Sequence, residues 1–348
     1  MVSEEDVRKA LSQVQDPELG KDLVSLGMVR DIQIEGNTVA FSLVLTIVSC
    51  PLRFHMAEDA RTQLKKLPGV DEVVVNFGAM TAEERKAVLG SSKPALPKLN
   101  EMNRIGRVLS VMSGKGGVGK SSVTAMLAVE LARQGKKVGI LDADITGASI
   151  PKLFGLPGGG LRGGPQGILP AVTPLGIRIV SSNLMLKEED AAVAWRGPMI
   201  AGMIEKFWSD VLWGKLDFLL VDLPPGTSDA TITVMRSLPV EGVFLVTTPQ
   251  QLAALVVRKA ANLLQRLDIP VLGVIENMSY FRHPISGEIF EIFGPSHAAE
   301  IAEHCQAEIV ARLPVDPQVA QLCDAGSVED TRVKELDAVV ERLVGSRG

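Results

Sequence analysis

One short stretch of the sequence combines glycines, two lysines and a serine in a spacing suited to phosphate binding. It reads Gly114-Lys115-Gly116-Gly117-Val118-Gly119-Lys120-Ser121 and matches the pattern G-x-x-x-x-G-K-[S/T]. Glycines let successive backbone N–H groups curl around phosphate oxygens, and a helix starting in the loop adds its positive dipole end. In this pattern Lys120 neutralises the β- and γ-phosphates, and the Ser121 hydroxyl coordinates Mg²⁺. The motif predicts an ATP site with magnesium.

Carboxylates follow two of the aliphatic runs. Asp222 ends one of these runs, at the strand edge where ligands bind in open α/β sheets, and we expect it to hold the magnesium shell as a Walker-B aspartate. In the stiff turn that follows, the Gly226 amide is placed to sense a γ-phosphate. Asp142 and Asp144 follow the strand after the loop helix, and Asp144 is a candidate to orient or activate the attacking water. The alternative role for Asp144 is a turn or helix cap.

The elements that must position these residues alternate between strand and helix from Arg107 onward. Between the first two strands, apolar residues at helical spacing predict a helix over Lys120–Gln134. The continuous aliphatic runs are typical of strands buried on both faces of a parallel sheet, so we predict a doubly wound, mostly parallel α/β domain. The expected strands are Val108–Ser113, Lys137–Asp142, Ile177–Ser181, Asp217–Asp222, Gly242–Thr247 and Val271–Glu276.

The first 80 residues predict a separate small α+β domain. Helices are expected over Glu4–Gln13 and Leu52–Leu67. Strands are expected over Val29–Glu35, Thr38–Thr46 and Val70–Phe77, with a hairpin turn at Gly36-Asn37. Proline, serine and lysine without periodicity then indicate a linker. The expected division is 1–80, 81–105 (linker) and 106–348 for the nucleotide-binding domain.

Composition narrows the class of protein. The formal net charge of -5 and the pI near 5.6 argue against nucleic-acid binding, which needs a basic face. Three cysteines are too few for a disulfide-stapled secreted protein, and acidic residues open the chain where a signal peptide would be basic. The longest apolar run, 39–52, is shorter than the roughly 18–20 residues that span a bilayer. We therefore expect a cytoplasmic protein with no membrane and no nucleic-acid partner.

Lys115, the lysine that the loop has in addition to Lys120, points to a particular group of nucleotide-binding proteins. The string Lys115 to Ser122 resembles the deviant Walker A motif of the nitrogenase-iron-protein, MinD and ParA group. In that group the extra lysine reaches the nucleotide of the partner subunit, so the resemblance implies an ATP-gated homodimer that hydrolyses ATP as a switch. The bland alternative for Lys115 is a solvated loop lysine.

Further segments resemble the Mrp/ApbC family of iron–sulfur cluster carriers. In that family the Asn277 position reads adenine and the loop Pro314-Val315-Asp316 packs near the base. The resemblance implies a carrier that serves apoprotein clients or iron–sulfur assembly factors. The resembling segments are ILDADITGASIPKLFG (140–155), WRGPM (195–199), DLPPGTSD (222–229), TTPQ (247–250), ENMSYF (276–281) and LPVDPQVA (313–320).

The N-terminal region resembles the small domain of iron–sulfur maturation factors, through Asp16-Pro17-Glu18, 24–27, Leu45-Thr46 and Cys50-Pro51-Leu52. Cys50 lies between an expected strand and helix. There it is either a thiolate activated by the helix N-terminus or a buried cysteine acting as a small hydrophobe.

One departure from the family pattern concerns the cargo. The family has a C-x-x-C pair after the ENMSYF segment, and here His283 and Ser286 stand in its place. Imidazole ligates iron in some clusters, whereas a serine hydroxyl is a poor ligand for a soft iron–sulfur unit. The competing interpretation of His283 is an exposed loop residue, and Cys305 and Cys323 lie in no ligand spacing and are expected to be packing residues.

Two other functions compete with cluster carriage. A MinD/ParA-type positioning switch predicts a basic surface or a basic amphipathic anchor. The amphipathic segment 333–344 mixes acidic and basic residues, which favours a helix docked on the domain. A reductase like the nitrogenase iron protein is a weaker alternative, because its cluster cysteines are not recognisable.

Overall fold

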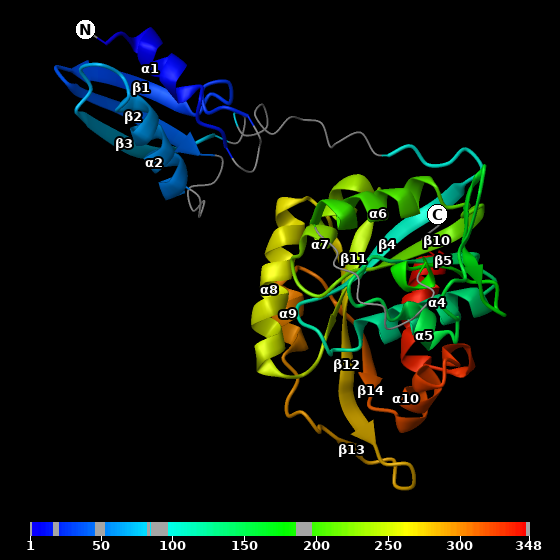
Figure 1. The fold of residues 1–348 in the computed structure, drawn as a ribbon. Helices are drawn as coiled ribbons and strands as arrows, with labels where there is room; N and C mark the ends of the chain where they lie inside the picture. The colour runs from blue at the N-terminus through cyan, green and yellow to red at the C-terminus, as the bar shows by residue number, and fades with distance from the viewer. Residues whose placement is uncertain are drawn as a thin grey trace. The chain divides into compact units, whose positions relative to one another are not determined.

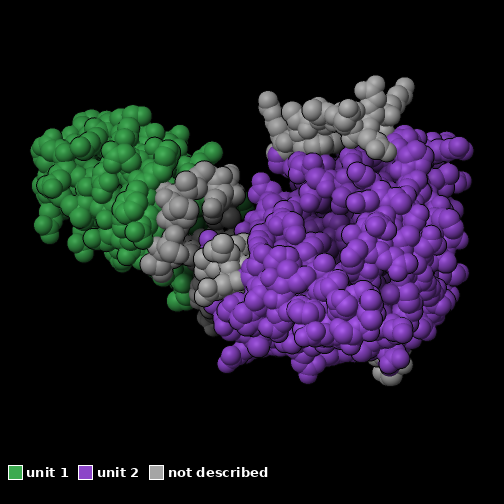
Figure 2. All heavy atoms as spheres, turned by 90° about the horizontal axis from the view of Figure 1, so that it is seen from below, with its two compact units in different colours: residues 1–93 green, residues 94–348 purple. Residues whose placement is uncertain are grey.

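The chain folds into two compact units, residues 1–93 and 94–348 (Figure 2). Cys50, Trp195 and Arg196 lie outside the part of the chain that the structure describes, as do residues 85–96 of the expected linker. The boundaries 1–80, 81–105 and 106–348 stay a proposal. The computed structural model describes residues 2–16, 21–45, 53–81, 84, 97–185 and 197–345, apart from the side chains of 198 and 251–256.

In its described residues, the smaller unit is a three-stranded sheet with two helices packed on it. Its elements are α1 (Glu4–Leu11), β1 (Val29–Glu35), β2 (Thr38–Leu45), α2 (Arg53–Leu64) and β3 (Glu72–Ala79). β1 and β2 form an antiparallel hairpin, and β3 runs parallel to β2. Val39, Phe41 and Leu43 alternate along β2 and are buried, because one face of the strand packs against the helices. The predicted small α+β domain is confirmed.

The larger unit is built on a sheet of nine described strands. Their order is β13-β12-β11-β4-β10-β5-β9-β8, with β14 also paired to β12. Only β8 and β13 pair antiparallel among them, so the predicted mostly parallel sheet is confirmed. The strands are β4 (Arg104–Ser113), β5 (Val138–Asp142), β8 (Ala171–Val172), β9 (Arg178–Val180), β10 (Lys215–Asp222), β11 (Gly242–Thr247), β12 (Val271–Arg282), β13 (Ile289–Phe290) and β14 (Ile309–Pro314).

Helices cover both faces of this sheet (Figure 1). One face packs α6 (Gly197–Ser209), α7 (Asp229–Ser237), α8 (Gln251–Arg266) and α9 (Ala298–His304). The other packs α4 (Lys120–Arg133), α5 (Ile150–Leu153), α10 (Pro317–Asp324) and α11 (Asp337–Gly345). All five residues of β5 are buried as a result, which explains the uninterrupted aliphatic runs in the sequence.

Some segments differ from the sequence prediction. β12 extends to Arg282 rather than ending at Glu276, because its second half pairs antiparallel with β13. Met278 lies there at φ 55, where the register against β14 shifts. β4 begins at Arg104 rather than Val108, because it pairs with β10 from its first residue. The segment 158–164, rich in glycine, contains the first strand of a small hairpin formed by β6 (Arg162–Gly164) and β7 (Gly167–Leu169).

The C-terminal segment folds as the docked helix α11. Val339, Val340 and Leu343 are buried in the core on the α4 side of the sheet. Across the described ranges, no helix combines the length and the apolar character needed to cross a membrane.

Candidate nucleotide site

The phosphate-binding motif forms the turn between β4 and α4. Gly117 and Gly119 have φ of 79 and 77, in the left-handed region that favours glycine. A Cβ on Gly119 would also lie 2.3 Å from Asn277 Nδ2, so the loop has no room for a side chain there. Gly119 is the N-cap of α4 and provides no side-chain cap, which leaves the first N–H groups of the helix available to an anion. This backbone fits the phosphates of a nucleotide.

Three predicted residues meet at the start of α4. Lys120 Nζ lies 2.7 Å from Asp222 Oδ2 as a buried ion pair, with side chains 6% and 0% exposed. The Ser121 hydroxyl donates to the same carboxylate oxygen at 2.6 Å. Asp222 ends β10, which pairs with both β4 and β5, so the sheet places it beside the loop. One hydroxyl and one carboxylate fit Mg²⁺, which is usually bound in nucleotide sites through one or two carboxylates plus phosphates and waters.

Thr124 is a further residue of this cluster, and it was not predicted from the sequence. Its hydroxyl lies 2.7 Å from Asp222 Oδ1, and both residues are fully buried. Thr124 follows Lys120 by one helical turn, so both project from the same face of α4. A threonine at this spacing from the motif lysine is the signal that points to it.

Two further aspartates adjoin Asp222 at the end of β5. Burial and the nearby Asp222 charge raise the pKa of Asp142 to about 8, against the opposing effects of Lys120 and a 3.0 Å hydrogen bond from Ser181. The pKa of Asp144 is also raised, chiefly by desolvation. Asp144 Oδ1 accepts from Gly147 N at 3.1 Å, which is the turn contact expected of the alternative role. Asp144 is near enough for Lys120 and Asp222 to influence its charge.

Lys115 and Gly226 both make contacts near the start of the loop. Lys115 Nζ donates to Gln250 Oε1 at 2.8 Å, at the N-cap of α8. Gly226, at φ 78, donates its N–H to the Ser113 carbonyl at 2.8 Å, and a Cβ added at this position would lie 3.6 Å from Gly114 O. The turn after Asp222 is therefore bonded to the last residue of β4, directly before the phosphate loop.

The residues expected near the base lie in the middle of β12 and after β14. Asn277 Nδ2 donates to Val118 O at 2.9 Å, so the loop and the middle of β12 are bonded. Glu276 is fully buried beside it and accepts from the Ser279 and Ser296 hydroxyls at 2.5 Å each, which fixes this part of the strand. Val315 N donates to Tyr280 O at 2.7 Å, and this contact brings the expected segment 314–316 to the same strand. Asp316 caps α10 by accepting from Gln318 N.

Ser122, the last residue of the motif string, does not join the Asp222 cluster. A hydrogen bond with Ser122 acts on the Cys323 thiol, whose pKa is nevertheless raised, first by burial. Ser122 therefore points from α4 toward α10.

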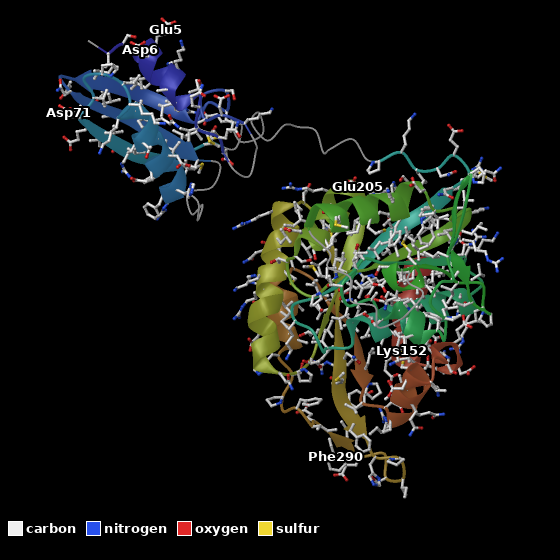
Figure 3. The ribbon with its side chains drawn as sticks, in the orientation of Figure 1. Glu5, Asp6, Asp71, Lys152, Glu205 and Phe290 are labelled. Carbon is white, nitrogen blue, oxygen red and sulfur yellow. The ribbon has the colours of Figure 1, made fainter. Side chains whose placement is uncertain are left out.

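The hairpin after β12 carries the two residues that stand where the family pattern has cysteines. His283 Nδ1 lies 3.1 Å from both the N–H and the hydroxyl of Ser286, and Gly287 N donates to His283 O. The side chains at these two positions thus converge across a closed turn. Phe290, labelled in Figure 3, marks this hairpin at the far end of β12 and is 44% exposed.

The described cysteines are unsuited to ligate a cluster. Cys305 and Cys323 are buried in opposite cores, as expected of packing residues. Desolvation raises the pKa of Cys305 to about 11. Within the described ranges, no three His, Cys, Asp or Glu side chains are grouped to hold a metal ion.

The fold and the loop define a P-loop nucleotide-binding protein. Residues 104–345 match the family described as NUBPL iron-transfer P-loop NTPase, and residues 4–76 match the iron-sulfur cluster assembly protein family. The chain belongs to the NUBPL iron-transfer P-loop NTPase family, which carries ATPase activity as a class.

Relatives extend over both units. An iron-sulfur cluster carrier protein from Synechocystis sp. is 38% identical, covering 99% of this chain and 98% of that protein. A carrier of the same name from Deinococcus radiodurans is 38% identical over 97% of this chain and 93% of its own. Among solved structures, a nucleotide-binding protein from Archaeoglobus fulgidus in complex with ADP is 46% identical, with a TM-score of 0.60, over 67% of this chain and 91% of its own.

Proposed function

We propose that this protein is an iron–sulfur cluster carrier that uses ATP binding and hydrolysis as a switch. The observation that carries the proposal is the buried cluster of Lys120, Ser121 and Asp222 at the phosphate loop, in a chain whose relatives over its whole length are named carriers. These relatives favour carriage over a MinD/ParA-type positioning switch.

In the proposed site, the loop backbone and Lys120 bind the phosphates. The Lys120 ammonium now pairs with Asp222, and it exchanges part of this contact for phosphate oxygens when nucleotide enters. Ser121 and Asp222 would hold Mg²⁺, which supplies charge neutralisation on the β- and γ-phosphates. Asn277 and Pro314–Asp316 bind the base, and Asn277 releases the Val118 carbonyl to do so.

Hydrolysis requires a water oriented for attack and groups that stabilise the negative charge of the γ-phosphate. Asp144 is the residue proposed to accept the water's hydrogen bond, because desolvation raises its pKa and makes it a better proton acceptor. The Gly226 amide now donates to the Ser113 carbonyl, and in this proposal it turns from that carbonyl to the γ-phosphate when nucleotide binds.

The proposed functional unit is a homodimer in which Lys115 crosses to the partner's nucleotide. Its present contact is to a neutral amide at the positive end of α8, where a cation gains little. A phosphate of the partner site is a stronger acceptor, so nucleotide favours the crossed position.

The iron–sulfur cluster is the proposed cargo, and His283 and Ser286 provide no thiolate to hold it. Cys50 is the proposed cluster thiol, since burial raises the pKa of both Cys305 and Cys323. Apoprotein clients or iron–sulfur assembly factors are the proposed partners.

Cluster transfer tests this function. The anaerobic protein is loaded with iron and sulfide and mixed with an apo-ferredoxin, with and without Mg-ATP. We expect thiolate-to-iron absorption on the loaded protein and ATP-dependent transfer, with Lys115→Ala binding nucleotide but losing the ATP response. A protein that hydrolyses ATP yet neither loads nor transfers a cluster contradicts carriage.

A further inference from the structure

Thr124 is a buried hydroxyl that the proposed reaction does not yet use. Its Oγ1 lies 2.7 Å from Asp222 Oδ1 and 3.0 Å from the Lys120 carbonyl oxygen. A hydroxyl has one hydrogen to donate, and a charged carboxylate is the stronger acceptor. The hydrogen therefore goes to Asp222.

The two oxygens of Asp222 have different partners. Oδ2 receives both Lys120 and Ser121, the residues that meet phosphate and magnesium. Oδ1 faces Thr124, in the interior between α4 and β10, where both side chains have no exposure. The contact to Thr124 fixes the rotation of the carboxylate, so that Oδ2 is the oxygen presented to the Ser121 hydroxyl.

We propose that Thr124 is a positioning residue for the magnesium site. It orients Asp222 so that a cation meets Oδ2 and the Ser121 hydroxyl together. The proposal rests on the proposed role of Asp222 in the magnesium shell. Hydrogen-bond partners of metal-ligating carboxylates typically affect metal affinity by about 10- to 100-fold.

The isosteric variant Thr124→Val separates positioning from packing. Valine keeps the volume of the site and removes only the donor, whereas Thr124→Ser keeps the donor. Thr331→Val is the matched control: the residue is 2% exposed, and its hydroxyl donates to the Val328 carbonyl, away from the loop. All three variants remove or alter one buried hydroxyl contact, and only Thr124→Val leaves Asp222 without a donor at Oδ1.

The measurement is the free Mg²⁺ concentration that gives half-maximal ATPase activity, with ADP affinity in EDTA recorded in parallel. We expect Thr124→Val to raise the half-saturating Mg²⁺ by about tenfold or more. Thr124→Ser and Thr331→Val should stay within about twofold of wild type, and ADP affinity in EDTA should not change. If Thr124→Val does not fold, Thr124→Ala carries the same expectation.

The variant Asp222→Asn distinguishes the positioning role of Thr124 from the magnesium-binding role of Asp222. Should Asp222→Asn lose the Mg²⁺ response while Thr124→Val keeps the wild-type value, the positioning role is overturned and the proposed function stands. Should Asp222→Asn keep the wild-type response, the assignment of Asp222 itself fails.

Discussion

Two regions of the larger sheet, the central strands β4 and β10 and the β12–β13 hairpin at one side, differ sharply in how firmly their polar side chains are held. At β4 and β10, Lys120 and Asp222 are buried, paired at 2.7 Å and joined by the hydroxyls of Ser121 and Thr124. At the β12–β13 hairpin, His283 and Ser286 converge at 3.1 Å on a turn whose neighbour Ile285 is 91% exposed. In the first region, buried contacts already hold the side chains that would bind nucleotide and magnesium. In the second, the turn is closed, but its side chains are poor ligands for the soft iron of a cluster.

The difference has a physical basis in burial. A buried carboxylate must be paired and hydrogen-bonded, so Asp222 constrains every residue around it. An exposed hairpin tip imposes no such demand, because water satisfies its polar groups. Side chains at the tip can therefore change without cost to the fold, and the ligand pair of a resembling family can be replaced.

The largest expected effect is at the buried pair of Lys120 and Asp222. Lys120→Met removes the phosphate-neutralising charge, and we expect ATPase activity to fall by at least about 100-fold. It also leaves Asp222 buried without its ion partner, which typically costs about 3–5 kcal/mol of folding stability. Steady-state ATPase and thermal unfolding measure the two effects.

The exposed lysine Lys152 on α5, labelled in Figure 3, provides the matched control. Lys152→Met should keep wild-type activity and melting temperature. Full ATPase activity in Lys120→Met would contradict the role of Lys120 in binding the phosphates.

The second prediction concerns the β12–β13 hairpin, where a cysteine pair can be introduced. Introducing His283→Cys together with Ser286→Cys places two thiolates on a turn whose side chains already converge at 3.1 Å. We expect this double variant to gain thiolate-to-iron absorption after anaerobic reconstitution beyond that of wild type. His283→Ser, which leaves no thiolate, is the control. No gain in iron would mean that the turn, and not only its residues, has lost the cluster geometry.

The third prediction concerns the pH dependence of folding stability through Asp142. Its pKa is raised to about 8 in the folded protein, above the unfolded value of about 3.9. The folded state therefore holds this proton more tightly, and the resulting stability is fully present below about pH 4 and lost as pH rises through about 8. Asp142→Asn carries no such proton, so wild type should lose stability relative to the variant across this window.

Thermal unfolding without nucleotide, in EDTA, at about pH 5 and about pH 8.5 measures this difference. Each kcal/mol lost corresponds to roughly 2–4 °C in the midpoint for a domain of this size. A difference between wild type and Asp142→Asn that stays constant with pH would contradict the raised pKa.

The loop and Asp222 of the candidate nucleotide site could be predicted from the sequence, because each carries a signal in its own neighbouring residues. The loop is one contiguous string, and Asp222 ends a recognisable aliphatic run. The contact of Thr124 with Asp222 joins residues 98 apart, and that of Lys115 with Gln250 joins residues 135 apart. Such contacts arise from the order of strands in the sheet, which motif spacing does not encode.

The fold was predictable to a similar degree. Gly242–Thr247 was predicted to the residue, since an aliphatic run buried on both faces is unambiguous. The extension of β12 beyond Glu276 was missed because it depends on pairing with β13, and on a bulge at Met278 in a conformation unusual for methionine.

Iron content after anaerobic reconstitution with Mg-ATP tests the central claim most directly, namely that the cargo is held through Cys50 and not by the β12–β13 hairpin. The wild-type chain, Cys50→Ala, His283→Ala and the buried-thiol control Cys305→Ala are compared at equal nucleotide occupancy. The account predicts that Cys50→Ala loses most of its iron while His283→Ala and Cys305→Ala keep it. Iron lost with His283→Ala but kept with Cys50→Ala, or no iron on the wild-type chain, would contradict it.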